Sequence, residues 1–268
     1  NIKKEFPIFD EKIQNNDLVY LDSANSSQKP NTVIKKISDF YETEFSNVGR
    51  SVHTLAVKAT NRFEDTRDKV KKYLNTKHRE EIIFTKSATE SINLVASSFG
   101  DKFINQGDEI ILTELEHHSN YIPWHFLRQR KNAIIKFAQM NSKGEVEIEE
   151  IKKLISNKTK IIAITHISNV TGAIMPIKKI VDLARSKKIP VLIDGTQGAP
   201  HLHLDMQDID CDFYAISCHK MYGPNGLGIL YAKKKWLEDL PPYQGGGGMI
   251  SEVKKDKVTF ANSPTRFE

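Results

Sequence analysis

Cysteine is scarce in this chain, which has Cys211 and Cys218 as its two among 268 residues. Two cysteines without a repeated spacing argue against a disulfide framework and are typical of a reducing compartment. Long apolar runs are also missing, and the longest, such as residues 161–165, are far shorter than a membrane span. We therefore expect a cytoplasmic protein that does not act in a membrane.

Charge of one sign is not in large excess. Lys and Arg number 39 against 34 Asp and Glu, for a formal net charge of +5. The basic residues are scattered, with short runs such as residues 233–235, whereas a nucleic-acid-binding protein gathers them with aromatics on one element. We interpret the charge as a solvated surface that favours an acidic partner or an anionic ligand, and we expect no nucleic-acid partner.

Two further kinds of pattern are absent. The glycine-rich residues 223–228 and 245–248 match neither the dinucleotide fingerprint nor the phosphate loop, and we predict turns there. A metal site is the alternative for the residues of ligand type, which are His201, His203, Cys211, Cys218 and His219. Their spacings match no zinc pattern, so we predict no metal.

The chain does contain a regular alternation of short β-branched runs with longer segments of helical period. Strands are expected at 81–84, 109–113, 133–138, 160–165, 191–194, 212–217 and 228–231, and helices at 90–99, 121–130, 148–156 and 177–187. This order predicts an α/β fold with a mostly parallel sheet and helices on both faces. Residues 1–45 are expected to form an arm and a helix on a large domain of residues 46–268.

An α/β sheet binds ligands outside the carboxyl ends of its strands. Five polar groups follow five different expected strands: residues 87–89, residues 116–118, His166 with residues 168–169, Asp194 with Gln197, and residues 217–220. We expect these groups to converge on one cleft.

Two of these groups carry patterns that allow two interpretations. Ser87 and Glu90 have the spacing of a capping box, in which Ser87 caps a helix and Glu90 reaches back; the same helix start can hold a phosphate. Asp194 follows an apolar strand and either caps the next turn or pairs with a protonated ring nitrogen. Gln197 could then hydrogen-bond a phenolic oxygen on the same ring.

Lys220 and a pair of histidines complete the candidate site. Most lysines are solvated, but a turn-forming stretch follows Lys220, and a partly desolvated lysine has a lowered pKa and can form a Schiff base. Ser217 and His219 would flank it and bind a phosphate. Of His117 and His118, we expect one to stack on a cofactor ring and transfer protons, and the other to lie outside the cleft.

These residues resemble a known family. Asp194 to Gln197, followed by Ser217 to Lys220 with Lys220 26 positions after Asp194, resembles the signature of the class V aminotransferases of pyridoxal-phosphate fold type I. Segments 21–24, 116–120, 165–170, 222–224 and 245–250 are similar to the group II cysteine desulfurases, which are themselves similar to selenocysteine lyases. The resemblance runs from about Phe6 to the last residue.

The resemblance implies pyridoxal 5′-phosphate as cofactor and a role for particular residues. Lys220 would bind the cofactor as a Schiff base, Asp194 would pair with its pyridine nitrogen, and Gln197 would bind its phenolic oxygen. His117 would stack on the ring and shuttle protons.

The remaining roles concern the phosphate and the substrate. Thr89, Ser217 and His219 would bind the phosphate, and Asn169 would position the substrate. Asn25 stands where the family usually has Ala, close to the expected substrate pocket.

The activity implied by the resemblance is conversion of L-cysteine to L-alanine by a homodimer. The sulfur would pass as a persulfide to an acceptor protein that feeds iron–sulfur cluster assembly. In the family, the nucleophilic cysteine and a carboxylate-binding arginine come from a C-terminal small domain that we expect to be missing here. Neither Cys211 nor Cys218 matches that cysteine.

Three alternatives to this activity stay open from the sequence. Two are enzymes of the same superfamily, a selenocysteine lyase or another class V aminotransferase. The third is a catalytically incomplete fragment that binds pyridoxal phosphate.

Overall fold

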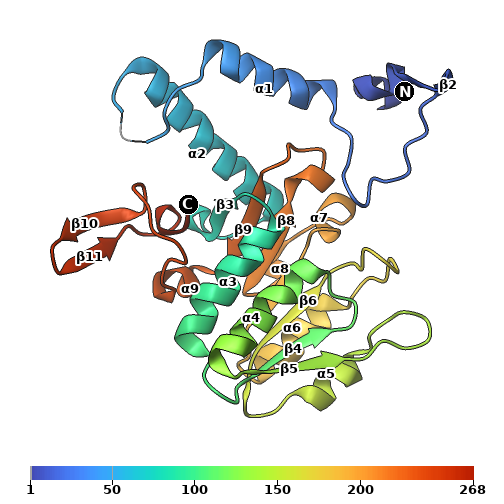
Figure 1. Cartoon of the computed structure of the whole chain (residues 1–268), viewed down its shortest axis with the longest axis vertical. Helices are drawn as coiled ribbons and strands as arrows, with labels where there is room; N and C mark the ends of the chain where they lie inside the picture. The colour runs from blue at the N-terminus through green and yellow to red at the C-terminus, as the bar shows by residue number, and fades with distance from the viewer. Residues whose placement is uncertain (1, 50) are drawn as a thin grey trace.

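A seven-stranded sheet runs through the protein, which is described by a computed structural model over residues 2–49 and 51–268 (Figure 1). The strand order is β3-β9-β8-β7-β6-β4-β5. The strands are β3 (Ile82–Thr85), β4 (Glu109–Thr113), β5 (Ile134–Ala138), β6 (Thr159–Thr165), β7 (Val191–Asp194), β8 (Phe213–Ser217) and β9 (Gly228–Ala232). The strands from β8 through β5 pair in parallel, while β9 is antiparallel to both its neighbours. The predicted mostly parallel α/β sheet is confirmed.

Helices cover both faces of this sheet (Figure 1). The longer ones are α2 (Thr54–Leu74), α3 (Ala88–Phe103), α4 (Ile122–Lys131), α5 (Ile148–Leu154) and α6 (Ile177–Ser186), and the shorter ones are α7 (Gly198–His201), α8 (Met206–Ile209) and α9 (Lys234–Asp239). Short 3-10 helices are η1 (Ile2–Glu5), η2 (Pro7–Asp10), η3 (Arg79–Glu81), η4 (His118–Asn120), η5 (Cys218–Lys220) and η6 (Thr265–Phe267).

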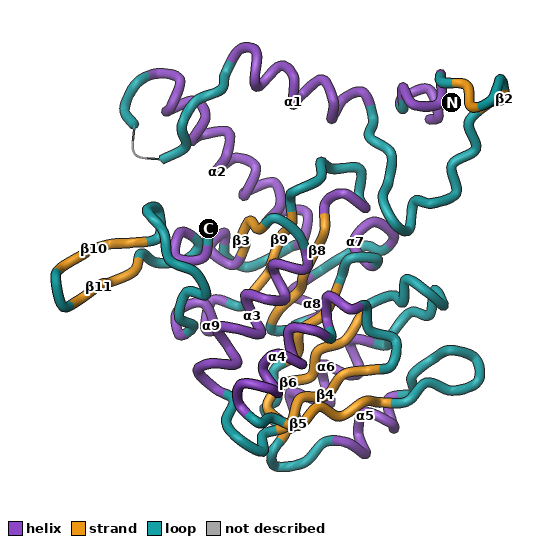
Figure 2. Tube along the Cα trace, in the orientation of Figure 1, coloured by secondary structure: helices purple, strands orange, loops and turns teal. Residues whose placement is uncertain are grey.

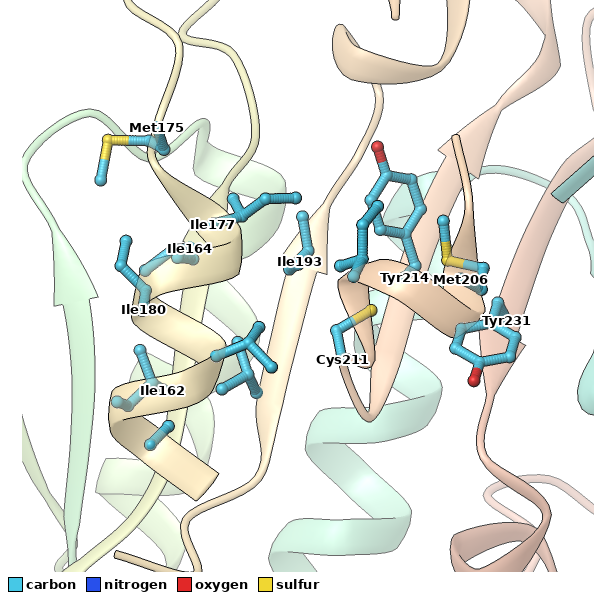
Figure 3. Close-up of a cluster of buried hydrophobic side chains, with 14 of the residues drawn as sticks. Ile162, Ile164, Met175, Ile177, Ile180, Ile193, Met206, Cys211, Tyr214 and Tyr231 are labelled. Atoms are coloured by element: carbon cyan, nitrogen blue, oxygen red, sulfur yellow. The ribbon is translucent and has the colours of Figure 1, made fainter. Parts of the chain in front are cut away.

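Each face of the sheet has its own apolar core, because successive side chains of a strand point to opposite faces. Ile162 and Ile164 of β6 pack with Ile180 of α6 on one face (Figure 3). Ile161 and Ala163, which alternate with them along β6, pack with Trp124 of α4 on the other face. Burial on both sides explains why these strands are continuous apolar runs.

Helix α2 and a hairpin are among the elements that were not predicted from the sequence. Helix α2 buries four of its 21 residues, and Leu74 is the one large aliphatic among them, so its sequence has no strong apolar period. The hairpin of β10 (Ile250–Lys254) and β11 (Lys257–Phe260) is largely exposed and charged. Neither segment has the burial that produces a readable pattern.

Arg67 joins α2 to the sheet. Its side chain is 1% exposed and packs against the rings of Phe63 and Phe84, with the guanidinium carbon 5.1 and 4.7 Å from their centroids. The guanidinium donates to the Ile82 carbonyl at 2.6 Å and to both carboxylate oxygens of Glu268 at 2.7 and 2.8 Å. Removing one partner of such a bidentate, largely buried ion pair costs much stability, because the other charge is left without a counter-ion.

The N-terminal segment contacts the sheet less than the other elements do. It contains the two-residue strands β1 (Lys12–Ile13) and β2 (Asn16–Asp17) and helix α1 (Asn31–Thr43), which buries none of its residues. Figure 1 shows α1 extending away from the sheet. The division of the chain at residue 45 stays a prediction. In the described part of the chain, no helix combines the length and apolarity needed to cross a membrane.

We expect Arg67→Leu to lower the free energy of unfolding by about 3–5 kcal/mol, because the Glu268 carboxylate, which is only 15% exposed, would lose its partner. Arg130→Leu is the matched control, since Arg130 is half-exposed and lies 3.6 Å from Asp101, and should cost less than about 1 kcal/mol. Urea unfolding of both variants measures the difference; equal losses would contradict the role given to Arg67.

Candidate functional site

One pocket, of about 180 Å³, lies at the carboxyl ends of the parallel strands. All eight residues singled out from the sequence line it, and they are Thr89, His117, Asn169, Asp194, Gln197, Ser217, His219 and Lys220. They follow β3, β4, β6, β7 and β8, so the structure brings together the five groups of strand-end residues. Asn25, from the N-terminal segment, also lines the pocket.

Lys220 and Asp194 come from neighbouring strands. Lys220 ends η5, directly after β8, and burial lowers the pKa of its amine, while the nearby carboxylates of Asp194 and Asp22 raise it. Asp194 ends β7 and is 4% exposed; its Oδ1 accepts from the Thr196 amide at 3.0 Å. Asp194 therefore caps its turn, as one interpretation predicted, and its second oxygen can still take another donor.

The turn after Asp194 rests on the buried pair of His166 and Tyr214; His166 belongs to the predicted strand-end groups but does not line the pocket. A Cβ on Gly195 would lie 1.8 Å from the Tyr214 ring, and one on Gly198 would lie 2.5 Å from His166 Nδ1. His166 Nδ1 and the Tyr214 hydroxyl are 2.7 Å apart. Burial lowers the pKa of His166 to about 4, so the imidazole is neutral near pH 7. The two glycines on this turn were the available signal that a bulky group lies beneath it.

The start of α3 is capped, but not entirely as predicted. Ser87 Oγ accepts from the Glu90 amide at 3.1 Å, as the capping box requires. The Glu90 carboxylate instead accepts from the Lys86 amide, one residue earlier than the box places it, and also from the Tyr243 hydroxyl. This second donor, distant in the sequence, draws the carboxylate away from the Ser87 amide.

Ser217 and Thr89 lie at this same helix start. The Ala88 amide donates to Ser217 Oγ at 2.9 Å, which joins the end of β8 to the first turn of α3. The Thr89 and Ser119 hydroxyls are 2.7 Å apart. Hydroxyls beside the free amides of a helix N-terminus can bind a phosphate.

His117 is the member of the histidine pair that lines the pocket. Its Nδ1 accepts from the Ser119 amide at 3.1 Å, which leaves the proton of the neutral ring on Nε2. The pKa of His117 is lowered, chiefly by burial and also by Lys220 and His118, and Asp194 opposes the shift. The ring is therefore held in one tautomer and favours the neutral form.

Gln197 and His219 are tied to the N-terminal segment. Gln197 Nε2 donates to the Ala24 carbonyl at 2.7 Å, and His219 Nδ1 lies 3.3 Å from Ser26 Oγ. Burial and the nearby cations Lys220 and Lys29 lower the pKa of His219. Two pocket residues that follow different strands are thus both held by the N-terminal segment.

Glu116 is a second residue to which the sequence gave no role. Its carboxylate accepts from Thr113 Oγ1 at 2.6 Å, the Thr165 amide at 3.0 Å and Asn120 Nδ2 at 2.7 Å. Asn120 in turn accepts from Trp124 Nε1 at 3.2 Å. The network joins the ends of β4 and β6 just before His117. Burial raises the pKa of Glu116 to about 7, against these hydrogen bonds and with help from Asp194.

Across residues 2–49 and 51–268, no group of three or more His, Cys, Asp or Glu side chains is arranged to hold a metal ion. A mostly parallel sheet with a half-buried lysine and a buried aspartate at adjacent strand ends is the arrangement of the pyridoxal-phosphate-dependent transferases of fold type I.

Comparison with known proteins identifies the family. The family described as "Aminotransferase class-V" matches residues 19–268, and the chain belongs to it. A "Probable cysteine desulfurase" from Staphylococcus epidermidis is 49% identical over 265 residues, and one from Staphylococcus aureus is 48% identical. Each match covers 99% of this chain, which spans 64% of the length of these relatives.

Solved structures agree with this result. The cysteine desulfurase CsdA of Escherichia coli superposes with a TM-score of 0.90 at 37% identity, covering all of this chain and 66% of that one. The apo cysteine desulfurase of Thermococcus onnurineus superposes with a TM-score of 0.93 at 31% identity, covering all of this chain and 65% of that one.

The pocket fits the cofactor of the family. Pyridoxal 5′-phosphate carries an aldehyde, a pyridine nitrogen and a phosphate. The pocket presents an amine, a buried carboxylate and a helix N-terminus with two hydroxyls, so each group of the cofactor has a chemically matching partner.

Glu116 should make stability depend on pH. Its pKa is about 7 in the folded protein, against an ordinary value of 4.5, so the unfolded chain loses its proton first as the pH rises. The free energy of unfolding should therefore fall between about pH 4.5 and 7 and be constant in this respect above. Urea unfolding across this range should show a smaller fall for Glu116→Gln. Glu149→Gln, on the exposed face of α5, should keep the wild-type fall; a fall of wild-type size in Glu116→Gln would refute the assignment.

Proposed function

We propose that this chain is the cofactor-binding part of a cysteine desulfurase that converts L-cysteine to L-alanine and hands on the sulfur. The observation that carries the proposal is the placing of the Lys220 amine and the Asp194 carboxylate on one pocket from the adjacent strands β8 and β7. The printed names of the relatives favour this activity over the other activities of the family.

The proposal gives each pocket residue a task. Lys220 holds the cofactor aldehyde, and its lowered pKa makes the neutral, nucleophilic amine available. Asp194 keeps a proton on the pyridine nitrogen, and Gln197 binds the phenolic oxygen. When bound, the cofactor supplies an electron sink for the substrate α-carbon.

The other five residues move a proton, bind the phosphate or position the substrate. His117 stacks on the ring and exchanges the proton at its Nε2. Thr89, Ser217 and His219 bind the phosphate at the start of α3, where the Thr89 and Ser217 hydroxyls lie at the positive end of the helix dipole. Asn169, on the exposed rim of the pocket, positions the substrate.

The sulfur-accepting thiol is neither Cys211 nor Cys218 in this proposal. Both are buried, and burial raises the pKa of Cys218 to about 11 and that of Cys211 further. A thiolate is the form that attacks sulfur, and these two thiols stay protonated. Figure 3 shows Cys211 within the apolar core, beside Tyr214. The persulfide then passes to an acceptor protein for iron–sulfur cluster assembly in the cytoplasm, where free thiols persist.

Borohydride treatment of the protein loaded with pyridoxal phosphate should attach the cofactor to the peptide that contains Lys220. Lys220→Ala should abolish the labelled peptide, because the aldehyde then has no amine in the pocket. Lys152→Ala, on the exposed side of α5, should leave it unchanged. Peptide mapping by mass spectrometry gives the answer, and a label at another lysine would contradict the proposal.

Product analysis with L-cysteine separates the candidate activities: alanine indicates a desulfurase, and a keto acid indicates an aminotransferase.

We further propose that the protein is a homodimer in which α1 contributes to the interface. Ile34, Ile37 and Tyr41 lie on one side of α1 and are 43%, 41% and 65% exposed; Phe45 stacks on Tyr41 with 5.3 Å between ring centroids. An amphipathic helix gains stability mainly by covering its apolar face. A second copy offers the same face, so the two can cover each other.

Ile37→Asp should shift the protein from dimer to monomer, because the interface would have to bury an unpaired carboxylate. Thr32→Asp adds the same charge on the opposite, polar side of α1 and should leave the dimer intact. Sedimentation velocity at a series of protein concentrations measures both. Wild-type protein that is monomeric throughout, or a dimer that tolerates Ile37→Asp, would count against this interface.

A further inference from the structure

The turn that carries Lys220 is held by a residue almost two hundred positions away. Residues 18–30 form a long loop that descends from β2 towards α7 and returns to α1 (Figure 2). Ser27 of this loop is 6% exposed. Its amide and its hydroxyl both lie 3.0 Å from the His219 carbonyl, and the Tyr222 amide lies 2.8 Å from its hydroxyl. One serine thus bonds the backbone on both sides of Lys220.

The direction of these bonds is fixed by the chemistry of the backbone. A backbone amide can only donate and a carbonyl can only accept. The Ser27 hydroxyl must therefore donate to the His219 carbonyl and accept from the Tyr222 amide, so that both functions of the hydroxyl are used. Alanine, whose side chain has neither a donor nor an acceptor, cannot make this bridge.

Two other side chains of the loop reach the same carbonyl. Lys29 Nζ donates to it at 3.0 Å and Ser26 Oγ at 3.3 Å. A carbonyl oxygen has two lone pairs, so these donors share it with Ser27. Of the three residues, Ser27 is the one whose side chain also takes the Tyr222 amide.

The turn has a reason to need an outside support. Tyr222 has a φ of +67°, in the left-handed region that residues other than glycine seldom adopt. Such a conformation costs free energy and persists where the surrounding contacts hold it. The bond from the Tyr222 amide to Ser27 holds the backbone of the strained residue, and the Phe6 ring packs 5.8 Å from its ring.

We propose that Ser27 is a positioning residue that clamps the turn of residues 219–222 and thereby holds the Lys220 amine inside the pocket. The role of that amine rests on the proposed function. The charged or titratable groups that face the amine are Asp194 from β7, Asp22 from the loop, His117 from the turn after β4 and the adjoining His219. Burial lowers the pKa of Lys220. The pKa therefore stays low only while the turn holds the amine inside the pocket.

The first test uses no cofactor. The protein is labelled with acetic anhydride at a series of pH values, and mass spectrometry gives the acetylated fraction of Lys220 and of the exposed Lys152. Lys220 should have a labelling midpoint at lower pH than Lys152 in the wild type. In Ser27→Ala the midpoint should move up towards that of Lys152, and Ser27→Thr, which keeps a hydroxyl, should restore it. Ser186→Ala, on the surface of α6, is the control and should change nothing.

The second test measures the dissociation constant for pyridoxal phosphate, which Ser27→Ala should weaken about tenfold, equivalent to about 1.4 kcal/mol. If Ser27→Ala does not fold, Ser27→Cys serves instead, because its weaker hydrogen bonds should give an intermediate shift. A lower urea midpoint with an unchanged labelling profile and unchanged dissociation constant would overturn the proposal. If the wild-type protein binds no cofactor at Lys220, but Ser27→Ala still raises the labelling midpoint of Lys220, the proposed function is refuted and the clamp is supported.

Discussion

The parallel pairing of β7 with β8 is the constraint on which the site depends. Its register sets Ile193 beside Tyr214 and Asp194 beside Ala215. The carboxylate and the turn that bears Lys220 therefore leave the sheet at adjacent points. The same register puts the Tyr214 ring beneath Gly195. Because side chains alternate along a strand, a slip of one residue would turn Asp194 to the wrong face if β7 moved, or Tyr214 if β8 moved.

The strand-end residues could be predicted because parallel strands obey a simple rule. Lys220, Asp194 and His117 each follow a readable apolar run, and the carboxyl ends of such runs meet at one edge. The core strands were readable for the same reason, since burial on both faces leaves continuous apolar segments. Helix α2 escaped prediction because it depends on Arg67, whose partners Ile82 and Glu268 lie far along the chain.

Supports that act across long sequence separations could not be predicted. Ser27 meets the Lys220 turn, and Tyr243 draws Glu90 out of its expected cap, through contacts that only the folded chain defines. Glu116 lies in a motif that was noticed, but its raised pKa comes from burial, which the local sequence does not report. Sequence therefore identified the groups that face the pocket better than the groups that hold them there.

The Tyr214 ring beneath the turn restricts which residues can replace Gly195 and Gly198 during evolution. While a ring occupies position 214, any side chain at Gly195 or Gly198 collides with the ring or its histidine partner. A smaller residue at 214 would make room at Gly195, although a side chain at Gly198 would still meet His166, and it would leave a void beneath the turn, which costs stability. A side chain at Gly195 and a smaller residue at 214 are each harmful alone, so these two positions have to change together.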